Sequence, residues 1–143
     1  MPDSGARLRT VLFVCIGNCV RSQMAESIAR RDAADVIVAE SAGLHPIGFI
    51  DKTAIAVLAE RGLSVEGQFS KSLRDQSLSK PDLIINMSGE RGPSFFHGNA
   101  VEHWPIQDPF GENLELHRSI CDDIERRVKD LAQRLRAENG SAS

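Results

Sequence analysis

The sequence of 143 residues has no long apolar run, little excess charge and no regular cysteine spacing. Its longest apolar run near the start, residues 11–16, is far shorter than the roughly 20 residues that cross a bilayer, and shorter than a usual signal-peptide core. The net charge of −3 gives no field that would attract nucleic acid or an anionic membrane surface. We therefore expect a cytoplasmic protein that binds neither, and in which any bound anion is held by local geometry.

The cysteines are also too few for a disulfide framework. Three cysteines cannot all pair with one another, and no zinc-type CxxC or HxxxH spacing is present. Three cysteines without a disulfide or zinc pattern are typical of a protein in a reducing compartment, where an unpaired cysteine can have a chemical role. Hydrophobic residues make up 41% and charged residues 26%, as in an ordinary globular protein. We expect one domain over residues 1–143, with flexible ends at 1–8 and 139–143.

Segments with the apolar pattern of strands alternate along the chain with segments that have the apolar spacing of helices. Short, β-branched apolar runs predict strands at 9–15, 36–40, 82–87 and 100–104. Helical spacing of apolar residues predicts helices at 22–34, 53–61 and from residue 112 onward. Ser22 is the expected cap of the first helix. Strands that alternate with helices predict a single α/β domain, in which a parallel sheet carries helices on both faces.

The segment between the first strand and the first helix carries the candidate site. The strand 9–15 delivers Cys15 to the carboxyl edge of the sheet, where open α/β sheets bind their ligands. Gly17 and Asn18 tolerate a left-handed backbone, which lets consecutive N–H groups turn inward around an anion. Arg21 supplies a planar fork for two oxygens of a tetrahedral oxyanion, and the helix start adds its positive end. The sequence therefore predicts a nucleophilic Cys15 thiolate in a phosphate-binding loop.

A carboxyl group after the last predicted strand completes the constellation. A phosphate monoester needs its leaving oxygen protonated, and Asp108 is suitably placed to act as the general acid. Pro109 stiffens its loop. An Asp-Pro pair is also a common turn start, so a purely structural role for Asp108 stays open. Cys121 lies on the apolar stripe of the last helix and is expected to fill the core.

The segment CIGNCVRSQMAE resembles the signature of the low-molecular-weight protein tyrosine phosphatases and of their relatives, the thioredoxin-coupled arsenate reductases. The resemblance continues through residues 41–43 and 59–63 to Trp104–Phe110, in the family's order, and so covers nearly the whole chain. It implies a four-stranded parallel sheet with the phosphate-binding loop after its first strand. It also implies that neither a metal nor an organic cofactor takes part.

Carried over by motif, the resemblance implies that Cys15 is the nucleophile, Arg21 the oxyanion ligand and Asp108 the general acid. Asn18 would brace the loop, and Ser22 would donate a hydrogen bond to the thiolate. The residues that bind the substrate oxyanion would be Ile16, Gly17, Asn18, Cys19, Val20 and Ser22.

Three functions stay open. The first is a phosphatase that acts on a phosphorylated protein or a small aryl phosphate, through a thiophosphoryl intermediate on Cys15. The second is arsenate reduction in the same loop. It is favoured by the local similarity of Arg21–Glu26 and Glu102–Trp104, and by a short loop at 41–48 that lacks the pocket aromatic of typical tyrosine phosphatases. The third is a module that binds a phosphorylated ligand without turnover. The phosphatase is the leading interpretation.

Arsenate reduction also needs thiols that supply two electrons. The resembling reductases relay oxidation through two further cysteines after the third strand, and this sequence has Ser88 and Phe95 where they would fall. Reduction would then need an external thiol as reductant. The family also often carries a cysteine directly before the arginine, where this chain has Val20. Whether Cys15 and Cys19 form a disulfide therefore stays open.

Overall fold

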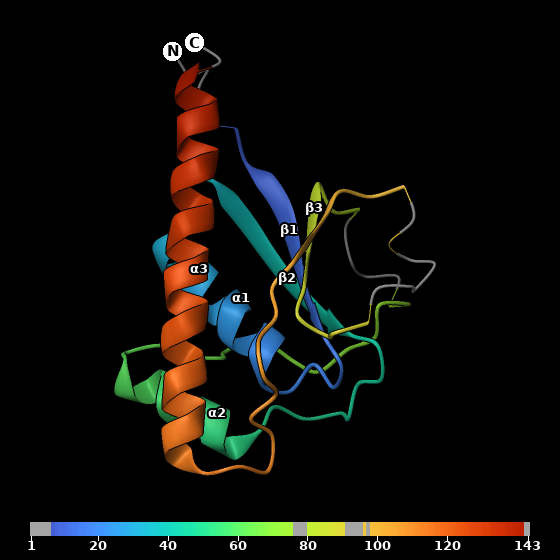
Figure 1. Ribbon diagram of the computed structural model, residues 1–143, viewed down its shortest axis with the longest axis vertical. Coiled ribbons are helices and arrows are strands. Elements are labelled where there is room, and N and C mark those ends of the chain that lie inside the picture. The colour runs from blue at the N-terminus through green and yellow to red at the C-terminus, as the bar shows by residue number, and fades with distance from the viewer. Residues whose placement is uncertain (1–6, 76–79, 91–95, 97, 142–143) are drawn as a thin grey trace.

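The computed structural model describes residues 7–75, 80–90, 96 and 98–141. This part of the chain alternates strands and helices, as the sequence predicts. Figure 1 shows the last and longest helix lying along the front of a twisted sheet. The elements are β1 (Arg9–Cys15), α1 (Arg21–Asp32), β2 (Ile37–Gly43), α2 (Lys52–Glu60), β3 (Leu83–Asn86), β4 (Val101–His103) and α3 (Leu114–Ser141).

The sheet has four parallel strands in the order β2-β1-β3-β4, which confirms the predicted α/β class. β1 lies between two neighbours, and its residues 11–15 are buried, as expected for a strand covered on both faces. β2 continues three residues beyond the predicted 36–40 because it stays in register with β1 until Cys15 meets Gly43. The carboxyl ends of β1 and β2 therefore lie side by side, where the candidate loop begins.

The three helices of the described residues pack on one face of the sheet. Val11 and Phe13 of β1 share one core with buried side chains of α1, α2 and α3. Leu12 and Val14 face the other way and meet non-helical residues, among them Leu73. The chain reaches this second face after α2 by crossing the carboxyl edge of the sheet, where the carbonyl of residue 71 accepts a hydrogen bond from the N–H of residue 43.

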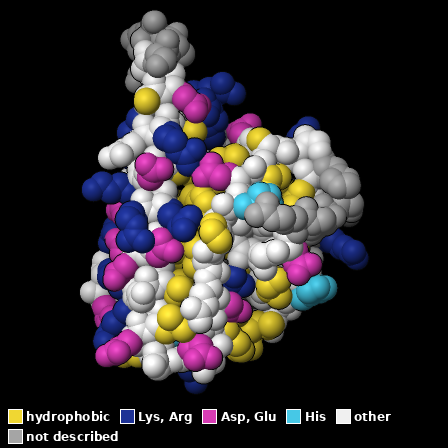
Figure 2. Space-filling model, in the orientation of Figure 1, with side chains coloured by type: hydrophobic (Ala, Val, Ile, Leu, Met, Phe, Trp, Pro, Cys, Tyr) yellow, Lys and Arg dark blue, Asp and Glu magenta, His cyan; other side chains and the backbone are white. Residues whose placement is uncertain are grey.

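α3 is an amphipathic helix whose buried stripe closes the core. The stripe consists of Ile120, Cys121, Ile124, Val128, Leu131 and Leu135. In Figure 2 its exposed side carries acidic and basic side chains intermixed. The helix begins after Asn113, whose Oδ1 accepts a hydrogen bond from the N–H of Leu116 at 2.8 Å. Among the described residues, no helix combines the length and apolar character needed to cross a membrane.

The helix α3 extends into the segment 139–143 that the sequence predicts to be flexible. The helix continues to Ser141, and Asn139 is buried with its amide donating to the carbonyl of Arg7 at 3.2 Å. This contact holds the last turn against the residues that precede β1. Residues 1–6 and 142–143 lie outside the described residues.

Candidate functional site

The loop between β1 and α1 turns its carbonyl groups outward. Four carbonyls within residues 15–19 accept hydrogen bonds from N–H groups of the segment 44–51, at 2.8 to 3.1 Å. Within the described residues, the N–H groups of residues 16–20 donate no hydrogen bond. A ring of unpaired N–H groups beside a helix N-terminus is a favourable place for an anion. The arrangement agrees with the predicted phosphate-binding loop.

Asn18 sets the shape of this loop. It has a φ of 48°, the left-handed conformation that asparagine tolerates better than most residues. Its side chain is fully buried: Nδ2 donates to Ser22 Oγ at 2.7 Å, and Oδ1 accepts from the N–H of Lys71 at 2.8 Å. Gly17 does not adopt a positive φ, contrary to the sequence argument. Its small size matters instead, since a Cβ there would lie 3.3 Å from Cys19 Sγ.

Cys15 lies at the end of β1, below the loop, and is 2% exposed. Its Sγ is 2.9 Å from Ser22 Oγ. Because Ser22 Oγ already accepts the hydrogen bond from Asn18, its own hydroxyl hydrogen is free to point at the sulfur. Ser22 does not cap α1: the N-cap position belongs to Val20, with no side-chain cap. The serine is therefore placed to contact the cysteine rather than the helix end.

Arg21 is buried and held by backbone. Its Nη1 donates to the carbonyls of Met87, just after β3, and Ile106, after β4, the latter at 3.0 Å. Its Nε is buried and has no hydrogen-bond partner among the described residues. A buried, unpaired guanidinium N–H is expensive unless a ligand accepts from it. No side-chain pattern could have revealed these two anchors, because they are carbonyl groups.

Asp108 lies on the loop between β4 and α3, beside Arg21. Its Oδ2 is 3.6 Å from Arg21 Nη2, and its Oδ1 accepts from the N–H of Phe110 at 3.1 Å. The Asp108 side chain is 48% exposed, whereas that of Arg21 is 6% exposed. The structure thus brings together the three predicted catalytic residues: a buried sulfur, a buried guanidinium and a carboxyl group in contact with solvent.

The other two cysteines lie in environments that raise the pKa of their thiols. Burial, with the negative charges of Cys15 and Asp108, raises the pKa of Cys19 from 9.0 to about 12. Burial raises the pKa of Cys121 to about 11. All three cysteines are free. The thiols of Cys19 and Cys121 therefore stay protonated near neutral pH, whereas the thiolate is the nucleophilic form of cysteine.

The structure describes only one of the two positions at which the resembling reductases carry relay cysteines. Ser88 lies just after β3 and is buried, with its Oγ donating to Asn86 Oδ1 at 2.6 Å. Phe95 lies outside the described residues. The segment after β3 therefore uses a serine hydroxyl to close a local turn.

A buried ionic cluster below the loop was missed from the sequence. Glu26 of α1 is 2% exposed, accepts from Ser41 Oγ at 2.6 Å and pairs with Arg30. Lys71 Nζ lies 3.9 Å from Glu26 Oε1, and burial lowers the pKa of this ammonium group. The backbone N–H of Lys71 is the group that holds Asn18. A glutamate on the apolar side of the first helix is the signal that could have indicated this cluster.

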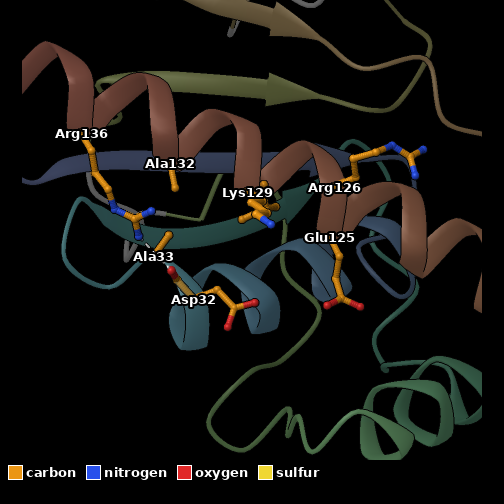
Figure 3. A pocket seen from close by; sticks show the side chains of 8 residues that line it. Asp32, Ala33, Glu125, Arg126, Lys129, Ala132 and Arg136 are labelled. Carbon is orange, nitrogen blue, oxygen red and sulfur yellow. Dashed lines mark hydrogen bonds between the residues drawn. The ribbon is translucent and has the colours of Figure 1, made fainter.

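A hollow lies away from this loop, between the end of α1 and α3 (Figure 3). It has a volume of about 520 Å³, and none of its lining residues belongs to the segment 15–22. Arg136 on its wall donates to the carbonyl of Asp32 and pairs with Asp35. Among the described residues, no group of His, Cys, Asp and Glu side chains could hold a metal ion. The loop after β1 is therefore the candidate site.

A parallel sheet whose first strand ends in a cysteine, below an inward ring of N–H groups, is the framework of α/β enzymes that hold an oxyanion against a thiol. The family model for the low molecular weight phosphotyrosine protein phosphatases matches residues 10–141. The chain belongs to this family.

Individual relatives divide between two activities. The chain is 31% identical over 131 residues to the glutaredoxin arsenate reductase of Synechocystis sp., covering 90% of this chain and 99% of that one. It is 32% identical over 143 residues to a probable low molecular weight protein-tyrosine-phosphatase, EpsP, of Ralstonia nicotianae, covering 91% and 98%. The finer assignment must therefore come from the site.

Solved structures of relatives show the same fold. An arsenate reductase in the phosphate binding state superposes with a TM-score of 0.80 at 31% identity, over 90% of this chain and 99% of that one. The YwlE arginine phosphatase of Geobacillus stearothermophilus gives a TM-score of 0.81 at 24% identity, over 94% and 97%, a likeness of fold.

Proposed function

We propose that this protein is a cysteine-dependent phosphatase that hydrolyses phosphate monoesters of the phosphotyrosine type. The observation that carries the proposal is the placement of Asp108, a solvent-exposed carboxyl group 3.6 Å from the buried Arg21. A binding module needs the arginine and the N–H ring, but it has no use for an acid at the mouth. An arsenate reductase has no ester oxygen, so the same acid could serve there only to protonate the arsenate oxygen that leaves as water.

The first step is attack of the Cys15 thiolate on phosphorus, which breaks the bond to the ester oxygen. The N–H groups of residues 16–20 and Arg21 Nε hold the three remaining phosphate oxygens as charge moves between them. Asp108 gives its proton to the departing phenolate. The products of this step are a thiophosphoryl-cysteine and the free phenol.

The second step regenerates the cysteine. Asp108, now a carboxylate, takes a proton from water, and the water oxygen attacks phosphorus. The S–P bond breaks, and inorganic phosphate and the thiolate are released. The Ser22 hydroxyl, 2.9 Å from Sγ, stabilises the thiolate as leaving group.

Arsenate reduction is the second candidate, because several relatives are named arsenate reductases. Arsenate has the shape and charge of phosphate and fits the same loop. Cys15 would displace one arsenate oxygen as water. A thiol would then attack Cys15 Sγ, releasing arsenite and leaving a disulfide that a second thiol reduces. Both thiols must be external, since Cys19 and Cys121 are protonated and buried.

A side-by-side assay tests the proposal. The purified protein is offered phenyl phosphate, or arsenate with thioredoxin, glutaredoxin or glutathione. We expect phosphate release in the first arm and negligible turnover with thioredoxin alone. Robust thioredoxin-dependent reduction would instead establish the reductase, with one of the secondary cysteines in the relay.

The variant Asp108→Asn separates general-acid catalysis from a role in loop shape. A phenolate of pKa ~10 leaves poorly unless it is protonated, so the variant should lose about 10²–10⁴-fold on phenyl phosphate. The loss on 4-nitrophenyl phosphate, whose phenolate leaves well unaided, should be clearly smaller. An equal loss on both substrates would show that Asp108 only shapes the loop.

A further inference from the structure

A buried histidine that the proposed chemistry does not use lies between the two loops of the site. His117 belongs to the first turn of α3 and is 1% exposed. Its Nδ1 lies 2.9 Å from the carbonyl oxygen of Asn113, and its Nε2 lies 3.4 Å from Asp51 Oδ2. Nε2 has no hydrogen-bond partner among the described residues. A buried polar atom of this kind needs a physical explanation.

One end of the histidine contact is the loop that carries Asp108. This loop is anchored at its start by Ile106, whose carbonyl accepts from Arg21 Nη1. It is anchored at its end by Asn113, which caps α3 and whose carbonyl meets the His117 ring. The general acid therefore lies on a short segment with two fixed points. The His117 ring contacts the second one, the Asn113 carbonyl, which also accepts from the His117 backbone N–H at 3.3 Å.

The other end of the contact is Asp51, which braces the oxyanion loop. Its backbone N–H donates to the carbonyl of Cys19 at 3.0 Å. Its Oδ2 caps α2 by accepting from the N–H groups of Thr53 and Ala54, at 3.2 and 3.3 Å. Asp51 thus fixes both the start of α2 and the far side of the ring of N–H groups.

The chemistry of the imidazole makes the contact directional. A carbonyl oxygen only accepts hydrogen bonds, so Nδ1 of His117 donates to Asn113. The carboxylate of Asp51 lies on the other side of the ring, with Oδ2 at 3.4 Å from Nε2. The ring thus acts as a clamp that contacts one group from each loop.

We propose that His117 is a positioning residue of the active site: by joining the end of the Asp108 loop to Asp51, it fixes the general acid relative to the oxyanion loop. The inference rests on the proposed role of Asp108. The oxyanion loop keeps its other bonds to the segment 44–51 and to Lys71 when His117 is lost. Loss of the clamp should therefore affect protonation of the leaving group more than binding of the oxyanion.

Two variants of different chemistry test the clamp. His117→Phe fills the space without donors, and His117→Gln keeps a donor that can reach Asp51. For the phenylalanine variant we expect kcat on phenyl phosphate to fall by about 10–100-fold, the cost of misplacing a catalytic group. The loss of kcat on 4-nitrophenyl phosphate should be smaller. The inhibition constant of inorganic phosphate should stay at the wild-type value. Glutamine should restore part of the rate on phenyl phosphate.

The control is Ile124→Val, a buried change about two turns beyond His117 on α3. It should lower the melting temperature without any dependence on the leaving group. Combining His117→Phe with Asp51→Asn should cost less than the product of the single losses, because both changes break one contact.

The outcomes separate the two proposals. A wild-type protein without aryl phosphatase activity overturns the proposed function, and this inference with it. An active wild-type protein overturns this inference alone if the histidine variants lose the same factor on both esters, or if Ile124→Val reproduces their pattern. Where the phenylalanine variant does not fold, the glutamine variant and the single variant Asp51→Asn carry the same comparison.

Discussion

Replacing Gly43 with alanine should damage the oxyanion loop without removing any chemical group. Gly43 ends β2 and pairs in register with Cys15. A Cβ at this position would lie 2.7 Å from the carbonyl oxygen of Ile16, 2.9 Å from the N atom of Asn18 and 2.9 Å from its Cβ. The first two are backbone atoms of the loop, so they cannot swing aside as the end of a flexible side chain does.

The size of the effect follows from these distances. Ordinary contacts of a Cβ begin at 3.4 Å, so the loop must retreat by about 0.5–0.7 Å (3.4 less 2.9 or 2.7). Overpacking of this kind costs about 1–3 kcal/mol of folding free energy. For a domain of this size each kcal/mol lowers the melting temperature by roughly 2–4 °C. Since a shift of ~1 Å costs up to 10²-fold in rate, kcat/KM should fall by about 10–100-fold.

The assay combines three measurements: kcat/KM on 4-nitrophenyl phosphate, the inhibition constant of inorganic phosphate and thermal unfolding. The matched control is Gly140→Ala, in the last turn of α3, where a Cβ would meet nothing within 4 Å. It should stabilise the protein by up to about 1 kcal/mol and leave activity unchanged. Wild-type phosphate inhibition in Gly43→Ala would refute the reasoning, since the contacted N–H group belongs to the proposed oxyanion ring.

Three further predictions concern the site itself. Cys15→Ser should abolish turnover and keep phosphate binding, measured by calorimetry, because Arg21 and the N–H ring remain; retained turnover would overturn the proposed mechanism. Arg21→Lys should lower kcat/KM severely, since an ammonium group cannot span two oxygens; a change of only a few fold would remove Arg21 as ligand. Iodoacetamide at pH 7 should modify Cys15 alone, with protection by phosphate, because the pKa values of about 12 and 11 keep Cys19 and Cys121 protonated. Peptide mass spectrometry identifies the modified cysteine, and early labelling of Cys19 would contradict the prediction.

The part of the site that the sequence predicts well is the part built by consecutive residues. The strand that ends at Cys15 has the predicted bounds, because a buried parallel strand needs an apolar run and little else. The left-handed turn falls on Asn18, one of the two residues expected to tolerate it. The candidate anion site follows from these local features together with the start of α1, so one short segment carries most of the information.

The rest depends on contacts between distant segments that leave little trace in the sequence. Arg21 is oriented by the carbonyls of Met87 and Ile106, and any residue type has a carbonyl group. Ser22 looks like a helix cap until the three-dimensional arrangement puts it beside Cys15. Likewise, a pattern of strands and helices does not say on which face of the sheet each helix packs.

In the proposed mechanism, a protein with a net charge of −3 holds a dianion because the positively charged Arg21 is buried and the negatively charged Asp108 is half exposed. Arg21 acts at close range in a site of low dielectric, where an ionic contact is stronger than in water. Asp108 lies close by but is half exposed, so solvent screens its repulsion of the substrate and exchanges its proton. The same balance serves phosphate and arsenate equally. What separates the two activities is then the supply of a second thiolate, and the environments of Cys19 and Cys121 leave that supply to an external thiol.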